Sequence, residues 1–365
     1  MTTLTGFIAA VIEAGWGILN EASVWLIISF ILAGLLYNYL DPKKFHRVLG
    51  NTSAGALFKA SVSGMMLPIC SCGVIPLGLG LYYSGAYLGP TLAFMCATPI
   101  INPAAVLLAL GLLGPKIAVI YIVAGFIVPM LVGMVGNLFG GPELHLPPVD
   151  DSEQVCFEEQ EVNWKEKLLG GIKWGISDMG VQVSKYVIWG MVLAGIITAA
   201  TPVGFIQKYL GSPGLISIGG IAVLAALMYV CAVGHIPFIA ALVAAGASPG
   251  VAITFLMAGA ATNLPELVSI CKLIGRRAAI IYFSCMVGMS ILVGWLTNLI
   301  LSPGFVPFFN LAKGQEAVGW ANKLILVSPE PVRYICSAAI VGLFIYAYWP
   351  KLKSVFASRE ANYET

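Results

Sequence analysis

Nine apolar segments recur along the chain, and they constrain its fold more than any other feature. They cover approximately residues 24–40, 57–81, 89–113, 117–138, 187–200, 216–243, 250–270, 278–301 and 334–348. A helix needs about 20 apolar residues to cross the roughly 30 Å hydrocarbon layer of a bilayer. Only 10% of the 365 residues are charged, and the mean hydropathy is +0.92. We therefore expect an all-α polytopic protein with several passes through the cell inner (plasma) membrane.

The two halves of the chain match at a constant offset. Pro68-Ile-Cys-Ser-Cys-Gly-Val-Ile-Pro76 aligns with Tyr229-Val-Cys-Ala-Val-Gly-His-Ile-Pro237, which pairs Cys70 with Cys231, 161 positions later. The same offset also pairs several residues elsewhere without a gap: Gly34 with Gly195, Gly85 with Gly246, Asn102 with Asn263, and Tyr121 with Tyr282. The match predicts two homologous four-helix repeats, followed by a C-terminal helix.

The predicted domain boundaries follow from these repeats. They are an interfacial N-terminal helix (1–23), a first transmembrane repeat (24–139), an acidic linker with an amphipathic helix (140–185), a second transmembrane repeat (186–301), an extramembrane loop (302–332), and a C-terminal transmembrane helix and tail (333–365).

Two relative orientations of the repeats are open. Four crossings per half make the repeats parallel, whereas one re-entrant segment per half makes them inverted. In the parallel arrangement most basic residues outside the apolar segments fall on one side, which the positive-inside rule makes cytoplasmic. Lys165, Lys167 and Lys173 fall on the other side. The balance of charges favours the parallel arrangement.

Proline and glycine interrupt the second and third segments of both halves. Proline removes an intrahelical hydrogen bond, and broken backbone at membrane depth occurs only where protein buries it or where it lines a wet cavity. Matched breaks in two repeats indicate the central site of a transporter. The predicted cavity-lining residues are Pro68, Gly73, Pro76, Thr98, Asn102, Gly234, Pro237 and Asn263.

Three cysteines lie at these breaks: Cys70, Cys72 and the repeat-related Cys231. Thiolates select soft centres, so the three residues are candidate ligands for a thiophilic metal ion or a trivalent metalloid. The alternative is that cysteine is a small buried hydrophobic residue. We favour that alternative for the cysteines in uninterrupted helical runs, which are Cys96, Cys271, Cys285 and Cys336.

Glu266 and His235 are candidates for proton coupling. Glu266 lies deep in an apolar segment, where a carboxylate costs about 2.5–3.5 kcal/mol and by default marks an ion or proton path. The alternative role is a neutral acid that caps the broken helix. His235 matches Val74 of the first half and titrates in the neutral range, although a packing role is equally open.

Two motifs resemble a known family. Leu67-Pro-Ile-Cys-Ser-Cys-Gly-Val-Ile-Pro-Leu77 and Phe94-Met-Cys-Ala-Thr-Pro-Ile-Ile-Asn-Pro103 are similar to the predicted permeases that include the organoarsenical efflux permease ArsP and the YraQ proteins. The resemblance covers roughly residues 25–301. It implies an inner-membrane permease that exports trivalent organoarsenicals, with Cys70 and Cys72 binding the arsenic. A related branch with a similar cysteine motif is associated with copper and zinc efflux.

The expected function is secondary-active, proton-coupled efflux of a soft thiol-reactive solute, with trivalent methylated arsenicals first. Its expected partners are this small solute and the lipid bilayer, with no nucleic acid, no cofactor and no enzymatic activity. The sequence contains no Gly-x-x-x-x-Gly-Lys-Ser/Thr motif for ATP. Efflux of Cu(I) or Zn(II) is the alternative within transport. A membrane thiol oxidoreductase with a Cys70–Cys72 redox pair is the alternative from another class, and the oligomeric state is open.

Overall fold

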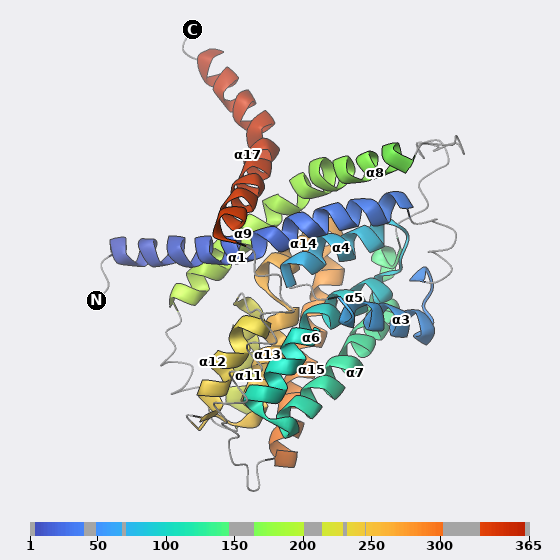
Figure 1. Cartoon of the computed structure of the whole chain (residues 1–365), viewed down its shortest axis with the longest axis vertical. Coiled ribbons are helices and arrows are strands. Elements are labelled where there is room, and N and C mark those ends of the chain that lie inside the picture. Colours follow the sequence, from blue (N-terminus) through green and yellow to red (C-terminus); the bar gives the residue numbers. More distant parts are fainter. Residues whose placement is uncertain are drawn as a thin grey trace.

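The computed structural model is helical throughout the part of the chain that it describes, residues 4–39, 49–67, 71–145, 164–200, 214–228, 232–244, 246–301 and 329–361, where no strand occurs (Figure 1). The first half contains α1 (Leu4–Tyr39), α3 (Ala54–Met65), α4 (Ser71–Tyr83), α5 (Leu88–Ile100), α6 (Pro103–Leu108), η1 (Ala109–Leu113), α7 (Pro115–Phe139) and η2 (Gly141–Glu143). The second half contains α8 (Trp164–Lys173), η3 (Trp174–Gly180), α9 (Val181–Ala200), α11 (Leu215–Leu227), α12 (Ala232–Ala244), α13 (Pro249–Ala261), α14 (Leu264–Leu273) and α15 (Arg276–Leu301), followed by α17 (Glu330–Ala361). The expectation of an all-helical chain is confirmed for these residues.

Several of these helices are suited to cross a membrane. Within the described residues, α7, α15 and the part of α17 from Glu330 to Trp349 are long and apolar enough by themselves. Three further spans are obtained if bent pairs count as one: the two parts of α1, α5 with α6 and η1, and α13 with α14. The chain is therefore a multi-pass membrane protein.

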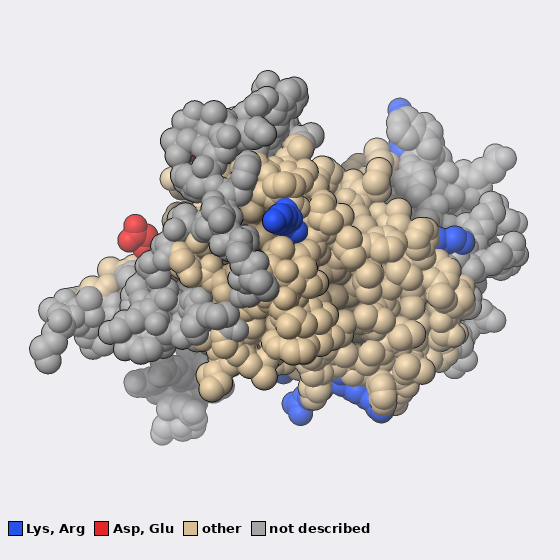
Figure 2. Space-filling model, turned by 90° about the horizontal axis from the view of Figure 1, so that it is seen from below, with Lys and Arg blue, Asp and Glu red and all other residues tan. Residues whose placement is uncertain are grey.

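The outer face of α7 shows what these helices present to their surroundings. Val119, Val123, Ile127, Met134 and Leu138 are exposed at helical spacing, while the opposite face of α7 is buried. Most of the described surface in Figure 2 carries neither acidic nor basic side chains, apart from one basic group within the face and others near its margins. An apolar surface of this kind is stable in lipid and unstable in water.

Helix bounds and hydrogen bonds recur at the spacing of 161 residues. The helices α4 and α12 begin and end 161 positions apart, as do α5 and α13. The Asn137 side-chain oxygen accepts a hydrogen bond from Gly89 N at 3.1 Å, and the Asn298 oxygen accepts one from Gly250 N at 2.7 Å. Each half contains more than four helices, so the predicted repeats of four helices are not confirmed.

The second apolar segment of the first half, predicted as one crossing over 57–81, consists of two short helices whose outer ends meet. Tyr87, after α4, donates its N–H to the carbonyl of Leu49, before α3, at 3.0 Å. With 12 residues, α3 is about 18 Å long, too short to cross a bilayer. The two ends of the segment therefore lie together, as in a re-entrant hairpin, and the crossing predicted over 57–81 is not confirmed.

The first helices of the two halves pack against each other in opposite directions. In Figure 1, α1 runs alongside α8 and α9. Gly34 lies against the backbone of Gly171, and Phe30, one turn earlier on α1, lies against Gly175, one turn later on the partner helix. Along this contact, the residue numbers fall on α1 as they rise on the partner helix, so the two helices are antiparallel. Their close approach depends on glycine, because a Cβ at Gly34 would collide with the carbonyl oxygen of Gly171.

Three predicted domain boundaries lie inside helices. The boundary at residue 23 falls within α1, the boundary at residue 185 within α9, and the boundary at residue 332 within α17. Residues 146–163 of the predicted linker and residues 302–328 of the predicted loop lie outside the described residues. The division into domains therefore stays a prediction.

The glycine contact between α1 and α8 is testable with a matched pair of substitutions. Gly34→Ala is expected to destabilise the protein by about 1–3 kcal/mol, because the added methyl group overpacks the helix crossing. Gly17→Ala on the same helix is expected to be neutral or slightly stabilising, since a Cβ at Gly17 has no atom within 4 Å. Thermal unfolding in detergent measures both changes. Equal unfolding temperatures for the two variants would contradict the glycine-dependent crossing.

Candidate functional site

The third segments of both halves break at an asparagine that caps the next helix. Asn102 Oδ1 accepts a hydrogen bond from Ala105 N at 2.8 Å, and Asn263 Oδ1 accepts one from Glu266 N at 3.1 Å. The chain bends by 42° between α5 and α6 and by 41° between α13 and α14. Asparagine is a preferred N-cap because its side chain satisfies an amide that begins a helix without a partner. The expected breaks at Asn102 and Asn263 are therefore present, with capping side chains.

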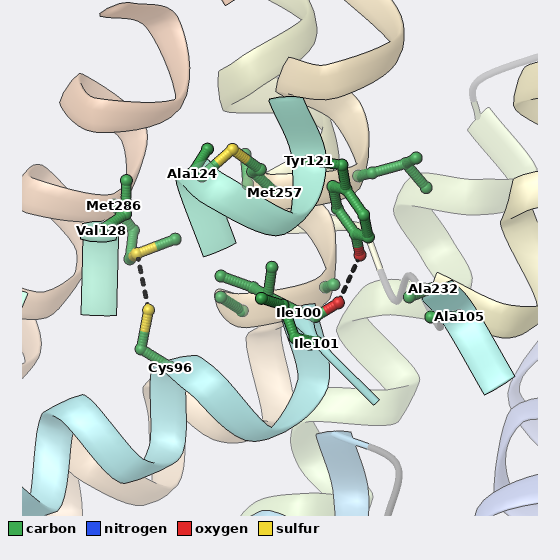
Figure 3. Close-up of a cluster of buried hydrophobic side chains, with 14 of the residues drawn as sticks. Cys96, Ile100, Ile101, Ala105, Tyr121, Ala124, Val128, Ala232, Met257 and Met286 are labelled. Atoms are coloured by element: carbon green, nitrogen blue, oxygen red, sulfur yellow. Dashed lines mark hydrogen bonds between the residues drawn. The ribbon is translucent and has the colours of Figure 1, made fainter. Parts of the chain in front are cut away.

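A buried tyrosine completes each break from the last helix of the same half. The Tyr121 hydroxyl on α7 donates to the carbonyl of Ile100 at 2.5 Å, which Figure 3 shows. The Tyr282 hydroxyl on α15 donates to the carbonyl of Ala261 at 2.6 Å. Both carbonyls end helices and need partners, because an unsatisfied polar group inside a membrane costs several kcal/mol.

Glu266 lies at the second of these breaks, where it is fully buried. The Tyr282 hydroxyl lies 3.1 Å from Oε1, and Asn263 Nδ2 donates to Oε2 at 3.3 Å. Both partners are neutral. The equivalent position in the first half is Ala105, in the first turn of α6, whose N–H is bonded by the matching asparagine cap. The break can therefore be built without a carboxylate, which weakens the interpretation of Glu266 as a structural cap.

A sulfur pair lies close to this carboxyl group, at the contact between the halves. Cys96 Sγ on α5 is 3.2 Å from Met286 Sδ on α15, and both residues are fully buried (Figure 3). The Cys96 thiol is also within electrostatic range of Glu266 and Cys285. The burial of Cys96 is consistent with the packing role expected for it.

The remaining predicted residues are distributed between the two re-entrant segments and the breaks. Pro68, Cys70 and Cys231 lie outside the described residues, as does the side chain of Cys72, which belongs to the first turn of α4. Gly73 and Pro76 are buried in α4, and the buried Thr98 hydroxyl donates to the Phe94 carbonyl at 2.8 Å. On α12 lie Gly234, the partly exposed His235, whose ring centroid is 6.1 Å from that of Phe255, and the exposed Pro237.

The two halves meet through the helices that follow the cysteine segments. The helix α4, which begins directly after Cys70, packs against α14 of the second half, which contains Glu266. In the same way α12, which begins directly after Cys231, packs against α6. Figure 3 shows Ala232, the first residue of α12, beside Ala105, the counterpart of Glu266. Each helix that starts at a cysteine segment thus packs against the helix that follows the third-segment break of the other half.

Two contacts near the site were not identified from the sequence. Tyr282 was noted only as a matched residue of the repeat, and the Cys96–Met286 pair gave no signal because the two residues are 190 positions apart. The recurrence of Tyr121 and Tyr282 at the repeat spacing was the signal available for the tyrosines. Among the described residues, no group of three or more His, Cys, Asp and Glu side chains could hold a metal ion. Cys70 and Cys231 were not part of that set.

The family model described as "predicted permease" matches residues 8–299, which is most of the chain. The chain belongs to this predicted-permease family. The permease is 23% identical to UPF0718 protein MJ0584 of Methanocaldococcus jannaschii, over 76% of its own length and 91% of the relative. It is 24% identical to UPF0718 protein YcgR of Bacillus subtilis, covering 71% and 87% of the two chains, and 24% identical to UPF0718 protein YraQ of Escherichia coli, covering 76% and 78%.

No solved structure matches the permease. The family and the apolar helices together make it a membrane-embedded transporter for a small solute. The predicted resemblance to the family that includes YraQ is confirmed.

Proposed function

We propose that the permease exports a soft, thiol-reactive solute, with trivalent methylated arsenicals as the first candidate. Cys70 and Cys72 capture the solute, Cys231 receives it, and proton entry through Glu266 drives its release. The observation that carries the proposal is the packing of α4, which begins directly after Cys70, against α14, which holds the buried Glu266 among neutral partners. Thiolates prefer soft centres, and a buried carboxyl group in a membrane protein by default marks a proton path.

We further propose that the two halves are inverted repeats. The ends of the α3–α4 segment meet on one side, which leaves three crossings in the first half: α1, α5 with α6, and α7. An odd number of crossings reverses the orientation of the second half. The antiparallel packing of α1 on α8 and α9 supports this arrangement. A second contact supports it: Glu143, just after α7, accepts hydrogen bonds from the N–H groups of Arg277 and Ala278 at the start of α15. The end of α7 and the start of α15 therefore lie on the same side, as inverted repeats require of these two matching helices.

The inverted arrangement accounts for the basic residues that a parallel one leaves unexplained. It places the groups 43–47, 165–173, 276–277 and 351–353, which contain most of the lysines and arginines, on one side of the bilayer. The positive-inside rule makes that side cytoplasmic. Lys165, Lys167 and Lys173 then join the cytoplasmic set, and the N-terminus lies outside.

This topology gives the cysteines an order along the transport path. The α3–α4 segment, with Cys70 and Cys72 between its arms, enters from the cytoplasm, and the α11–α12 segment, with Cys231, enters from outside. Two thiols hold a trivalent arsenical more tightly than one thiol does. Capture by the inner pair and release from the single outer thiol therefore suit export. The transfer from two thiols to one costs free energy, and we propose that His235, four residues after Cys231, assists release. Proton entry adds about 2.3 kcal/mol per charge per 100 mV of membrane potential.

Transport in everted membrane vesicles tests the solute and its ligands. Methylarsenite is expected to accumulate in vesicles that contain the wild-type permease, and Cys70→Ser, Cys72→Ser and Cys231→Ser are each expected to reduce the initial rate at least about tenfold by removing a soft ligand. Cys336→Ser on α17 is the matched control and is expected to transport normally.

Parallel uptake of arsenite, Cu(I) and Zn(II) distinguishes the alternatives. Accumulation of a metal ion alone would replace the arsenical with that ion. No transport, together with a Cys70–Cys72 disulfide that forms and is reduced reversibly in cells, would favour the thiol oxidoreductase.

Glu266→Gln tests proton coupling. Glutamine retains the size and polarity of the side chain and cannot exchange a proton, so uptake is expected to lose its dependence on an imposed pH gradient while solute binding persists. Initial rates with and without the gradient measure the effect. Unchanged pH-driven transport in this variant would remove Glu266 from the mechanism.

Cysteine labelling tests the inverted topology. A reporter cysteine in the acidic linker, Ser152→Cys, is expected to react with a membrane-impermeant maleimide in everted vesicles and to be protected in intact cells, because the linker is cytoplasmic. The N-terminal control, Thr2→Cys with the native linker cysteine removed by Cys156→Ser, is expected to show the opposite pattern. The parallel arrangement requires the linker cysteine to react from outside.

A further inference from the structure

The Tyr282 hydroxyl has two acceptors within reach but only one hydrogen. The carbonyl oxygen of Ala261 is 2.6 Å away, and Oε1 of Glu266 is 3.1 Å away. A tyrosine hydroxyl donates one hydrogen bond and can also accept one. If Glu266 is neutral, its own O–H can donate to the tyrosine oxygen while Tyr282 donates to Ala261, so all three groups are satisfied. If Glu266 is ionised, the carboxylate and the Ala261 carbonyl compete for the same hydrogen.

The carbonyl of Ala261 depends on this hydrogen because of the local sequence. It ends α13, and the residue four positions on, whose N–H would extend the helix, is Pro265, which has no N–H. A charged acceptor attracts a hydrogen-bond donor more strongly than a neutral carbonyl does. Ionisation of Glu266 is therefore expected to turn the Tyr282 hydroxyl away from Ala261 and to leave the end of α13 without its partner.

We infer that Tyr282 is a positioning residue that transmits the protonation state of Glu266 to the bend between α13 and α14. The inference rests on the proton-coupled step of the proposed function and adds the element that moves. A protonated Glu266 lets Tyr282 hold the bend, and an ionised Glu266 releases it. The first half contains the same bend and the same tyrosine bond, from Tyr121 to Ile100, with Ala105 in place of the carboxyl group. The bend of the first half therefore stays fixed at every pH. A change in the protonation of Glu266 moves only the bend of the second half.

Among the described titratable side chains on the helices around Glu266, Tyr282 on α15 is the one that forms a hydrogen bond with its carboxyl group. Cys285 lies on the same helix as Tyr282, and Cys96 approaches from α5. On α4, Tyr83 donates instead to the carbonyl of Leu273 at the far end of α14. The helix α9 contacts Pro265 through Gly190, and Lys185 and Tyr186 lie more than one turn away along α9. The side chain of Cys72, on α4, lies outside the described residues.

Hydrogen–deuterium exchange in lipid nanodiscs tests the inference without any transported solute. The probe is a peptide covering residues 258–267, followed across a pH series and corrected for the intrinsic exchange rate. In the wild type, protection is expected to fall as pH rises, because ionised Glu266 releases the bend. In Tyr282→Phe, protection is expected to be low at every pH. In Glu266→Gln, whose amide can donate to the tyrosine oxygen as the neutral acid does, protection is expected to be high at every pH.

Tyr121→Phe is the matched control. It removes the same type of bond in the first half, so it is expected to lower protection around residues 97–105 and to keep the pH response of residues 258–267. A pH response that persists in Tyr282→Phe, or that is missing from the wild type, would overturn the inference. If Tyr282→Phe does not fold, Glu266→Gln decides, because a remaining pH response in that variant also overturns it. A pH response without methylarsenite transport would leave the switch standing and reject only the solute.

Discussion

A backbone carbonyl that loses its helical partner inside a bilayer has no water to replace it, and the breaks of this permease are organised around that cost. At the ends of α5 and α13, a tyrosine hydroxyl from α7 or α15 supplies the missing donor. Asparagine caps satisfy the amides that begin α6 and α14. Because these partners come from the last helix of each half, the last helix must pack against the break, and the packing of each half follows from this requirement.

The repeated hydrogen bonds in the two halves show which residues the breaks themselves require. The asparagine caps and the tyrosine bonds occur in both halves at a spacing of 161 residues, so they are required by the breaks themselves. Glu266 occurs in one half only, with Ala105 at its counterpart. A buried carboxyl group that the breaks do not require is better explained by function than by stability, since it costs free energy wherever it is placed.

The helix breaks at Asn102 and Asn263 were predictable from residue patterns, and one part of the topology was not. Proline and asparagine located the breaks at Asn102 and Asn263, because their backbone restrictions are local. The apolar run 57–81 was read as a crossing, because its length and hydropathy match those of a membrane span. The bond between Leu49 and Tyr87, which brings its ends together, joins residues that no local pattern connects.

The sequence by itself determined the membrane class, the internal repeat, the helix breaks and the family, because composition, spacing and proline chemistry are properties of the chain. Only the tertiary structure decided that α1 runs antiparallel to α8 and α9, that Tyr282 reaches both Ala261 and Glu266, and that Cys96 meets Met286. These contacts depend on distances of a few ångströms between helices far apart in sequence. Such distances are set by the packing of whole helices, where a glycine at the crossing decides how closely two backbones approach.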